Sequence, residues 1–533
     1  MNKNYWFLLI LSILVLGCNS EDTPSQISIS WPTNNMFIKD SVTIKATVSD
    51  YENIKEVEFM IDGEVVDTIF ESPFEFVWNS KQVKNGDHNL QCKSIDNSGN
   101  ETLSEIIVVS VSNYLFKATF INNWVKDDEI CILFLSDQNG TILAENTFSG
   151  NDSFEMYLDE SLNLNYVDTI TKINITTIVG TTDEGIIHLN SHIKTYLKIP
   201  VGSSWTWKNY LLNYKEIPDT VKLNFKNIPE HKEYLISNKI FGTYSFVTLK
   251  SLEDFPLDES PTNIYMCLNT VENGKKYLWL NDVVAGNRQV DLSNLKDASK
   301  KTIELQGIPT RCEIELSGII ETSKRYENSY WLDAYFQDNN KSSSIDLFYP
   351  ESMFPEYTTK IYIKDNESPS SYWLQETHGE IPDKFIKLNA DFEFVSTSYD
   401  NFEISASGEF LITLSQWKDI NNNNYWDVYS DKTVLKYKLP NLPKLTTEQF
   451  GFNRESFTLI AVELIDHSNI KSFSEYTDIN FSSDTYLYNV VDDYRFRQKS
   501  NIANSSIVSR DESQKRINNL ISQNRYNGSC FIK

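Results

Sequence analysis

Residues 419–427 have the residue types and the spacing of a loop that binds a hard cation. The oxygen-bearing side chains of Asp419, Asn421, Asn423 and Asp427 stand at the first, third, fifth and ninth positions, and Tyr425 offers a backbone carbonyl at the seventh. Carboxylate, amide and carbonyl oxygens are the ligands that Ca²⁺ prefers in proteins. The spacing therefore predicts a Ca²⁺ loop.

This loop departs at two positions from a complete set of calcium ligands. Asn424 stands where a glycine would make the sharp turn, although asparagine also tolerates a left-handed backbone. Ser430 replaces the usual bidentate glutamate, and the neighbouring Asp431 is the candidate substitute. The segment resembles the calcium loops of bacterial surface β-proteins. The alternative is a plain Asn-rich hairpin turn between strands at 410–417 and 434–439.

Five aromatic residues lie in or beside polar stretches rich in Ser or Asn. A flat ring can cover the apolar C–H face of a sugar while the sugar hydroxyls stay hydrated. Rings in such stretches are therefore candidates for stacking on a glycan, and the alternative is that they cap the cores of β-sandwiches. The five candidates are Trp205, Trp207, Tyr372, Trp373 and Trp426.

The first 18 residues have the features of an export signal that ends in a cysteine. Lys3 supplies a positive charge, and residues 5–16 form an apolar run that is shorter than the roughly 20 residues needed to span a bilayer. Residues 15–18 read Val-Leu-Gly-Cys, which resembles a bacterial lipobox. The resemblance implies cleavage before Cys18 and lipidation of its thiol. The alternative is an ordinary secretory signal with an incidental cysteine.

Residues 18–26 are polar and acidic, which predicts a solvated tether. The segment resembles the acidic export signal of surface lipoproteins from Bacteroidetes-type bacteria. This resemblance implies a protein of the outer membrane that is held by its N-terminal lipid and faces the cell exterior. Acyl chains can hold a protein at a membrane without any transmembrane helix.

The overall charge restricts the possible partners, and the cysteine count restricts the possible disulfides. The chain has 48 Lys and Arg against 74 Asp and Glu, a formal net charge of −26, which disfavours a nucleic-acid partner. Beyond Cys18 the number of cysteines is odd, so at least one thiol is free or pairs with another chain. The oxidising compartment permits a disulfide between Cys267 and Cys312.

Residues 27–113 show the alternation of short β-strands separated by turns. Val57, Phe59 and Ile61 alternate with other residues ahead of an Asp-Gly turn at 62–63, and an Asn-Gly turn follows at 85–86. About seven such strands predict an immunoglobulin-like sandwich. The series resembles bacterial Ig-like domains, which serve as spacers and binding modules on secreted proteins.

The rest of the chain is β-rich, and 13% of all residues are aromatic. We expect an all-β fold of tandem β-sandwiches that ends in a short helix or a disordered tail, with a β-propeller as the alternative architecture. The predicted limits are 1–17 for the signal peptide, 18–26 for the tether, 27–113 for the Ig-like sandwich, 114–215 for a second β-sandwich, 216–325 and 326–440 for β-rich domains, 441–497 for a β-rich end segment, and 498–533 for a polar tail.

Two functions remain open on the sequence. The sequence contains no Gly-x-Ser-x-Gly, His-Glu-x-x-His or phosphate-binding glycine motif. A surface lipoprotein that binds a glycan or a protein partner without catalysis fits the acidic charge, the anchor and the Ig-like module. The alternative is a hydrolase acting on a polysaccharide, with a site of scattered carboxylates that the sequence does not single out.

The lipid anchor is testable with one substitution. Cys18→Ala removes the sulfur that would carry the acyl chains, so we expect the protein to leave the membrane fraction. Immunoblots of membrane and soluble fractions would measure the change, and an unchanged membrane fraction would refute the anchor.

Overall fold

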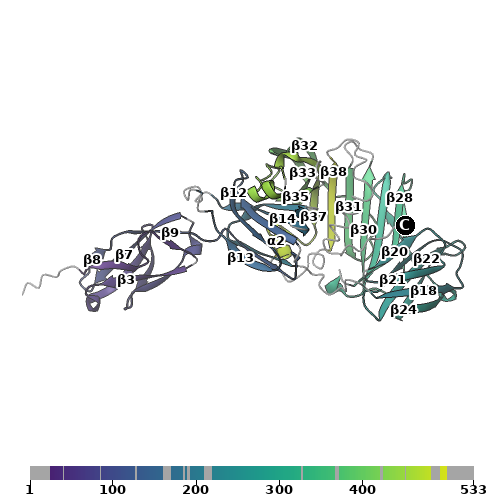
Figure 1. The fold of residues 1–533 in the computed structure, drawn as a ribbon, viewed down its shortest axis with the longest axis horizontal. Helices are drawn as coiled ribbons and strands as arrows, with labels where there is room; N and C mark the ends of the chain where they lie inside the picture. Colours follow the sequence, from purple (N-terminus) through teal and green to yellow (C-terminus); the bar gives the residue numbers. More distant parts are fainter. Residues whose placement is uncertain are drawn as a thin grey trace, which may run out of the picture. The chain divides into compact units, whose positions relative to one another are not determined.

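The computed structural model describes residues 25–39, 41–84, 86–126, 129–159, 162, 170–183, 186–188, 192–208, 219–239, 241–325, 328–365, 371–419, 424–450, 452–481 and 492–500. Two compact units make up the chain, one of residues 1–114 with 160–170 and one of residues 115–159 with 171–533 (Figure 1). Cys18 and the predicted C-terminal helix lie outside the described residues. Almost every described element is a strand, and the predicted all-β fold class is confirmed.

The first unit is the predicted Ig-like sandwich. One sheet has three strands in the order β1 (Ile27–Trp31), β3 (Ser41–Val48) and β6 (Glu75–Asn79). The strands of the other sheet are β2 (Met36–Ile38), β9 (Ile107–Val111), β7 (Gly86–Asp96), β4 (Ile54–Ile61) and β5 (Glu64–Ile69), with β8 (Glu101–Leu103) beside β7.

Strand alternation fills the core of this unit as predicted. Val57, Phe59 and Ile61 of β4 are buried with Trp78 of β6 in a single apolar cluster. Successive residues of a strand point to opposite faces of its sheet, so this spacing of apolar residues directs every second side chain inward. The Ig-like prediction thus follows from the period-2 pattern itself.

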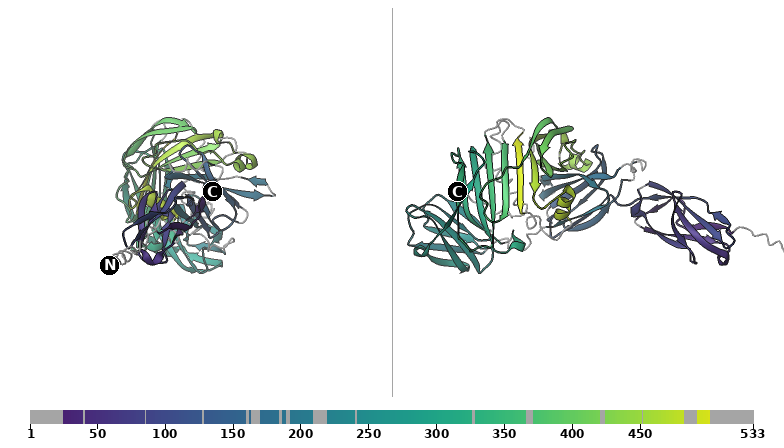
Figure 2. Two further views of the ribbon diagram at one scale, coloured as in Figure 1. Left: turned by 90° about the vertical axis from the view of Figure 1, so that its left-hand side faces the viewer. Right: turned by 180° about the vertical axis from the view of Figure 1, so that it is seen from behind.

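A 13-stranded sheet is the framework of the second unit (Figures 1 and 2). Strands from both sides of the domain limits predicted at 215, 325 and 440 belong to this one sheet. These domain limits stay predictions. Its strands are, in spatial order, β12 (Ile142–Phe148), β11 (Glu129–Ser136), β14 (Lys172–Asp183), β16 (His192–Pro200), β35 (Tyr425–Asp431), β34 (Ile412–Asp419), β37 (Phe457–His467), β38 (Asp493–Ser500), β31 (Ser371–Gly379), β30 (Glu356–Asp365), β27 (Arg311–Ile319) and β28 (Ser329–Asp338), with β15 (Ile186–His188) beside β14.

Smaller sheets accompany this framework. Three of them have three strands each: β13 (Asp152–Met156), β10 (Phe116–Ile121) and β17 (Ser203–Lys208); β21 (Ser251–Pro256), β18 (Thr220–Lys226) and β24 (Gly286–Asp291); and β32 (Ala390–Ser398), β33 (Asn401–Gly408) and β36 (Lys436–Tyr437). One has five strands, β20 (Gly242–Ser245), β19 (His231–Ser237), β22 (Thr262–Thr270), β23 (Gly274–Val283) and β25 (Lys296–Asp297), and one pairs β26 (Ser299–Glu304) with β29 (Ser344–Tyr349).

Apolar cores form where strands of the small sheets pack against the large one. Phe402 of β33 lies in one cluster with Trp417 of β34 and Trp426 of β35. Tyr265 of β22 lies in another with Ile314 of β27. Besides short 3-10 helices, the described residues include two α-helices, α1 (Lys444–Phe450) and α2 (Phe473–Phe481). Neither has the length and apolar character to cross a membrane.

Candidate functional site

Asp419, Asp427 and Asp431, three of the residues predicted to bind Ca²⁺, lie on the hairpin of β34 and β35. Asp427 pairs with Gln416, and Asp431 pairs with Ile412, seven residues along β34 from Asp419. At 3.4 Å per residue, Asp431 is thus about 24 Å from the level of Asp419. The prediction that Asp431 joins Asp419 as a ligand is therefore wrong, because strand pairing separates these two carboxylates along the hairpin. The roles of the other predicted ligands stay predictions.

Asp431 also has other hydrogen-bond partners. The Asp431 carboxylate accepts hydrogen bonds from the backbone N–H and the hydroxyl of Thr433, at 2.9 and 2.6 Å. Asn421 and Asn423 lie outside the described residues. Over the part of the chain that is described, no three His, Cys, Asp or Glu side chains form a group that could hold a metal ion. The partner strand of the hairpin is residues 425–431 rather than the expected 434–439.

Four of the five aromatic residues predicted to stack on a glycan are core residues instead. Trp205 stacks on Phe481 with ring centres 4.3 Å apart, and the indole N–H of Trp426 donates to the Thr195 hydroxyl at 2.9 Å. Trp207 and Trp373 are also buried. Their ring faces are covered by protein, so the glycan-stacking prediction is corrected for all four.

Tyr372 is half-buried and differs from the other four. Its ring stacks on Tyr362 at 5.4 Å between centres, and the Lys364 ammonium lies 5.2 Å from its ring centre. A cation over an aromatic face is attracted by the ring quadrupole. The role of Tyr372 in ligand stacking stays a prediction.

The disulfide between Cys267 and Cys312 does not form. Both thiols are free and lie in the same apolar cluster. Burial raises the pKa of each thiol to about 12, so both stay protonated and behave as small apolar side chains.

A group of mostly buried charged residues crosses β30 and β31, with the exposed Asp492 at its edge. The Arg325 guanidinium lies 2.6 Å from Glu356 and 3.0 Å from Asp492. Glu376 lies 3.4 Å from the His378 ring. Arg325 compensates the charges of Glu356 and Asp492, and the Lys360 ammonium lies 3.7 Å from Glu376, so the group is suited to holding strands together.

His378 is neutral in this group. Burial lowers its pKa to about 4, although the neighbouring Glu376 opposes the shift. One ring nitrogen lies 2.9 Å from the Thr358 hydroxyl. His467, with its ring stacked on Tyr494, has its pKa lowered to about 3 by burial.

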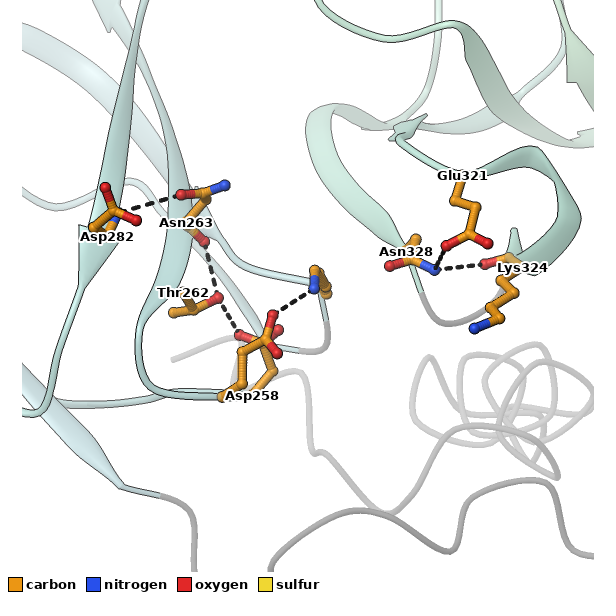
Figure 3. A network of polar contacts seen from close by, with 9 residues as sticks. Asp258, Thr262, Asn263, Asp282, Glu321, Lys324 and Asn328 are labelled. Atoms are coloured by element: carbon orange, nitrogen blue, oxygen red, sulfur yellow. Dashed lines mark hydrogen bonds and ion pairs between the residues drawn. The ribbon is translucent and has the colours of Figure 1, made fainter.

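Further polar contacts of the second unit join neighbouring strands and shape loops (Figure 3). Two of them lie within loops. The Thr262 hydroxyl donates to Asp258 at 2.7 Å, and burial raises the pKa of that carboxyl. Asn328 donates to Glu321 at 3.5 Å. Each contact joins residues close in sequence, which indicates a role in shaping these loops.

Trp31 is an exposed aromatic residue that the sequence does not single out as a candidate for ligand stacking. Ile27, Ile29 and Trp31 alternate along β1, so a regular strand would direct all three into the core. The register shifts between Ile29 and Trp31, however, and Trp31 then pairs with Lys45. A β-bulge of this kind re-aims a side chain, and it leaves the indole 42% exposed.

The surface around Trp31 is polar and has no net charge. Lys45, which pairs with Trp31, forms an ion pair with Glu75 of β6 at 3.0 Å. The alternating outward positions of β1 and β3 add hydroxyl groups from Ser28 and Thr47, which pair with each other. We call this set of five residues the Trp31 surface. It can offer a ring face and hydrogen-bonding groups to a ligand that is itself uncharged.

The comparison with protein families concerns the same unit. Residues 26–91 form a bacterial Ig domain. The match includes Trp31 and covers part of the predicted Ig-like region at 27–113. The rest of the chain matches no family. No curated protein matches the chain.

Two of the similar solved structures are of proteins from bacteria. The fibronectin(III)-like modules of Clostridium thermocellum CbhA are 24% identical, with 16% of this chain and 98% of that chain covered and a TM-score of 0.15. Bacteroides ovatus SGBP-B, solved with a mixed-linkage heptasaccharide, is 12% identical, with 62% and 93% covered and a TM-score of 0.15. TM-scores this low carry no inference about function.

The buried histidines predict how stability depends on pH. In the unfolded chain a histidine binds a proton near pH 6.5, whereas His378 and His467 bind one only at about 4 and about 3. Between these values the unfolded state binds more protons, so the free energy of unfolding falls as the pH drops below about 6.5, by a few kcal/mol per histidine.

Urea unfolding at pH 7 and pH 4.5 would measure this loss. His378→Gln keeps a hydrogen-bonding group opposite Thr358 but removes one titrating ring, so we expect a smaller loss in the variant. An equal loss in variant and wild type would contradict the assignment to His378.

Proposed function

We propose that the protein is a non-catalytic lipoprotein of the bacterial cell surface whose β-sandwich modules bind a glycan or a protein partner. Cys18 carries the acyl chains, and residues 18–26 link them to the Ig domain. The acidic charge of −26 keeps the displayed chain away from nucleic acids.

The Trp31 surface is the observation that carries the proposal. An exposed indole costs hydration free energy unless a ligand covers it, and aromatic rings supply large contact areas at binding sites. The ion pair between Lys45 and Glu75 cancels the charge around the ring. A neutral sugar fits this surface, because it has an apolar ring face for the indole and hydroxyl groups for the polar neighbours.

The hydrolase alternative requires two carboxyl groups about 5–10 Å apart on either side of a scissile bond. Glu356, a buried acid of the large sheet, is held by an ion pair with Arg325. A carboxylate that is held by a buried cation serves to join the strands, which leaves it poorly placed to protonate a leaving group. This pairing favours the binding function.

A glycan array with the full-length protein tests the proposal. We expect the wild type to bind at least one neutral glycan and Trp31→Ala to weaken that binding about tenfold, since a lost aromatic contact costs about 1–1.5 kcal/mol. Phe70→Ala is the matched control, because Phe70 is an exposed aromatic residue of the same domain that follows β5 of the other sheet.

The outcomes separate the parts of the proposal. Equal binding by wild type and Trp31→Ala would remove the Trp31 surface as the site. Glycan release into solution during the assay would favour the hydrolase. Absence of binding to every glycan, with retention of a cell-surface protein by the immobilised chain, would replace the glycan with a protein partner.

A further inference from the structure

Three ionisable side chains meet in the second unit without any role in the proposed function. The Lys275 ammonium of β23 lies 2.5 Å from Oδ1 of Asp333 on β28 and 3.2 Å from Oε1 of Glu233 on β19. The side chain of Asp333 is 3% exposed, that of Lys275 12% and that of Glu233 17%. One amine and two carboxyl groups thus share a nearly dry site.

Strand pairing places Lys275 and Glu233 on the same face of the five-stranded sheet. Glu233 pairs with Asn269 on β22, and Asn269 pairs with Lys275 on β23. Residues that pair directly across strands point to the same face, so the three side chains form one row. Asn269 donates to Glu233 at 3.1 Å and holds its carboxylate toward the lysine.

Asp333 reaches this row from the large sheet through a β-bulge. Leu316 of β27 pairs with Asp333, but the next residue, Ser317, pairs with Trp331. The extra residue reverses the alternation along β28, which turns Asp333 to the same face as Leu316 and into the apolar cluster between the sheets. A charged residue among buried side chains is costly unless its charge is compensated.

Two backbone N–H groups point at the Asp333 carboxyl. Ala334 donates to Oδ1 at 2.9 Å, and Phe348 donates to Oδ2 at 2.8 Å. Backbone donors in this arrangement stabilise negative charge that develops on oxygen when a nucleophile adds to the carbon. These donors favour addition of a nucleophile to the carboxyl carbon of Asp333, and the Lys275 nitrogen lies 2.5 Å from its Oδ1.

Glu233 is placed to accept and return a proton. Its Oε1 faces Lys275, and its Oε2 accepts a hydrogen bond from the Tyr244 hydroxyl at 2.7 Å. Burial raises the pKa of Asp333, which favours its acid form. Burial lowers the pKa of Lys275, but the neighbouring Asp333 outweighs this and leaves it raised, so the ammonium must lose a proton to Glu233 before its nitrogen can react.

We propose that Lys275 and Asp333 become joined by an intramolecular amide bond. Glu233 takes a proton from the Lys275 ammonium, and the free amine adds to the carboxyl carbon of protonated Asp333. The bond between that carbon and its hydroxyl oxygen breaks after Glu233 protonates the oxygen, and water leaves. Glu233 then removes the extra proton from nitrogen, so an ammonium and a carboxylic acid yield an amide, one water and a proton held by Glu233.

This bond would join two sheets of the second unit. β23 belongs to the five-stranded sheet and β28 is the edge strand of the 13-stranded sheet. No oxidant, metal or enzyme is required, because loss of water alone balances the step. A displayed protein gains resistance to proteases and to pulling forces from such a bond, since the two sheets can no longer separate.

Peptide mass spectrometry of the purified full-length protein tests the bond. We expect the tryptic peptides that contain Lys275 and Asp333 to appear as one species, lighter than their sum by one water. Fragment ions should place the link on these two residues. Separate, unmodified peptides from the native protein would overturn the proposal.

Variants assign the roles of the three residues. Lys275→Arg and Asp333→Ala should abolish the water loss, and Glu233→Gln should abolish it while it keeps a hydrogen-bond acceptor for Tyr244. Circular dichroism would confirm that each variant is folded. Formation of the link in folded Glu233→Gln would overturn the role of Glu233 in the proton transfers.

Lys276→Arg is the matched control. Lys276 is the next residue on β23, and its ion pair with Asp297 has the same 2.5 Å separation, but the Asp297 side chain is 82% exposed. We expect this variant to keep the link between Lys275 and Asp333. Absence of the link in the folded control would contradict the dependence on the buried site.

Discussion

Backbone hydrogen bonding between strands determines the face on which each side chain of this protein lies. Neighbouring residues of a strand alternate between faces, so one extra residue in a strand exchanges core and surface for the residues that follow it. Two such bulges matter here. One turns Trp31 out of the Ig-domain core, and the other turns Asp333 into the core beneath the five-stranded sheet.

The two bulges have opposite chemical consequences because the surroundings differ. At Trp31, a large apolar ring becomes hydrated beside an ion pair whose charges cancel, which leaves a surface suited to an uncharged ligand. At Asp333, a carboxyl loses its hydration and meets Lys275, and the charges must be compensated inside the protein. The same backbone feature thus underlies both the proposed binding surface and the proposed amide bond.

The sequence predicts the fold class and the Ig domain because both rest on alternation, as the burial of Val57, Phe59 and Ile61 illustrates. It does not predict the bulges, since Trp31 continues the pattern of Ile27 and Ile29. Asp431 is a wrong choice of Ca²⁺ ligand because residues close in sequence stay close in space only in a loop, and Asp431 lies at the far end of an extended strand from Asp419. Pairing of distant strands, such as β19 with β22, also has no local signal.

The claim that the bulge in β1 exposes the Trp31 ring can be tested by oxidation of tryptophan side chains with hydroxyl radicals, because the reaction rate follows the exposure of the ring. We expect Trp31 to react fastest among these indoles, while Trp205, Trp207, Trp373 and Trp426 react slowly in the native protein. Protection of Trp31 together with rapid oxidation of any of those four would contradict the assignment of the binding surface to the Ig domain.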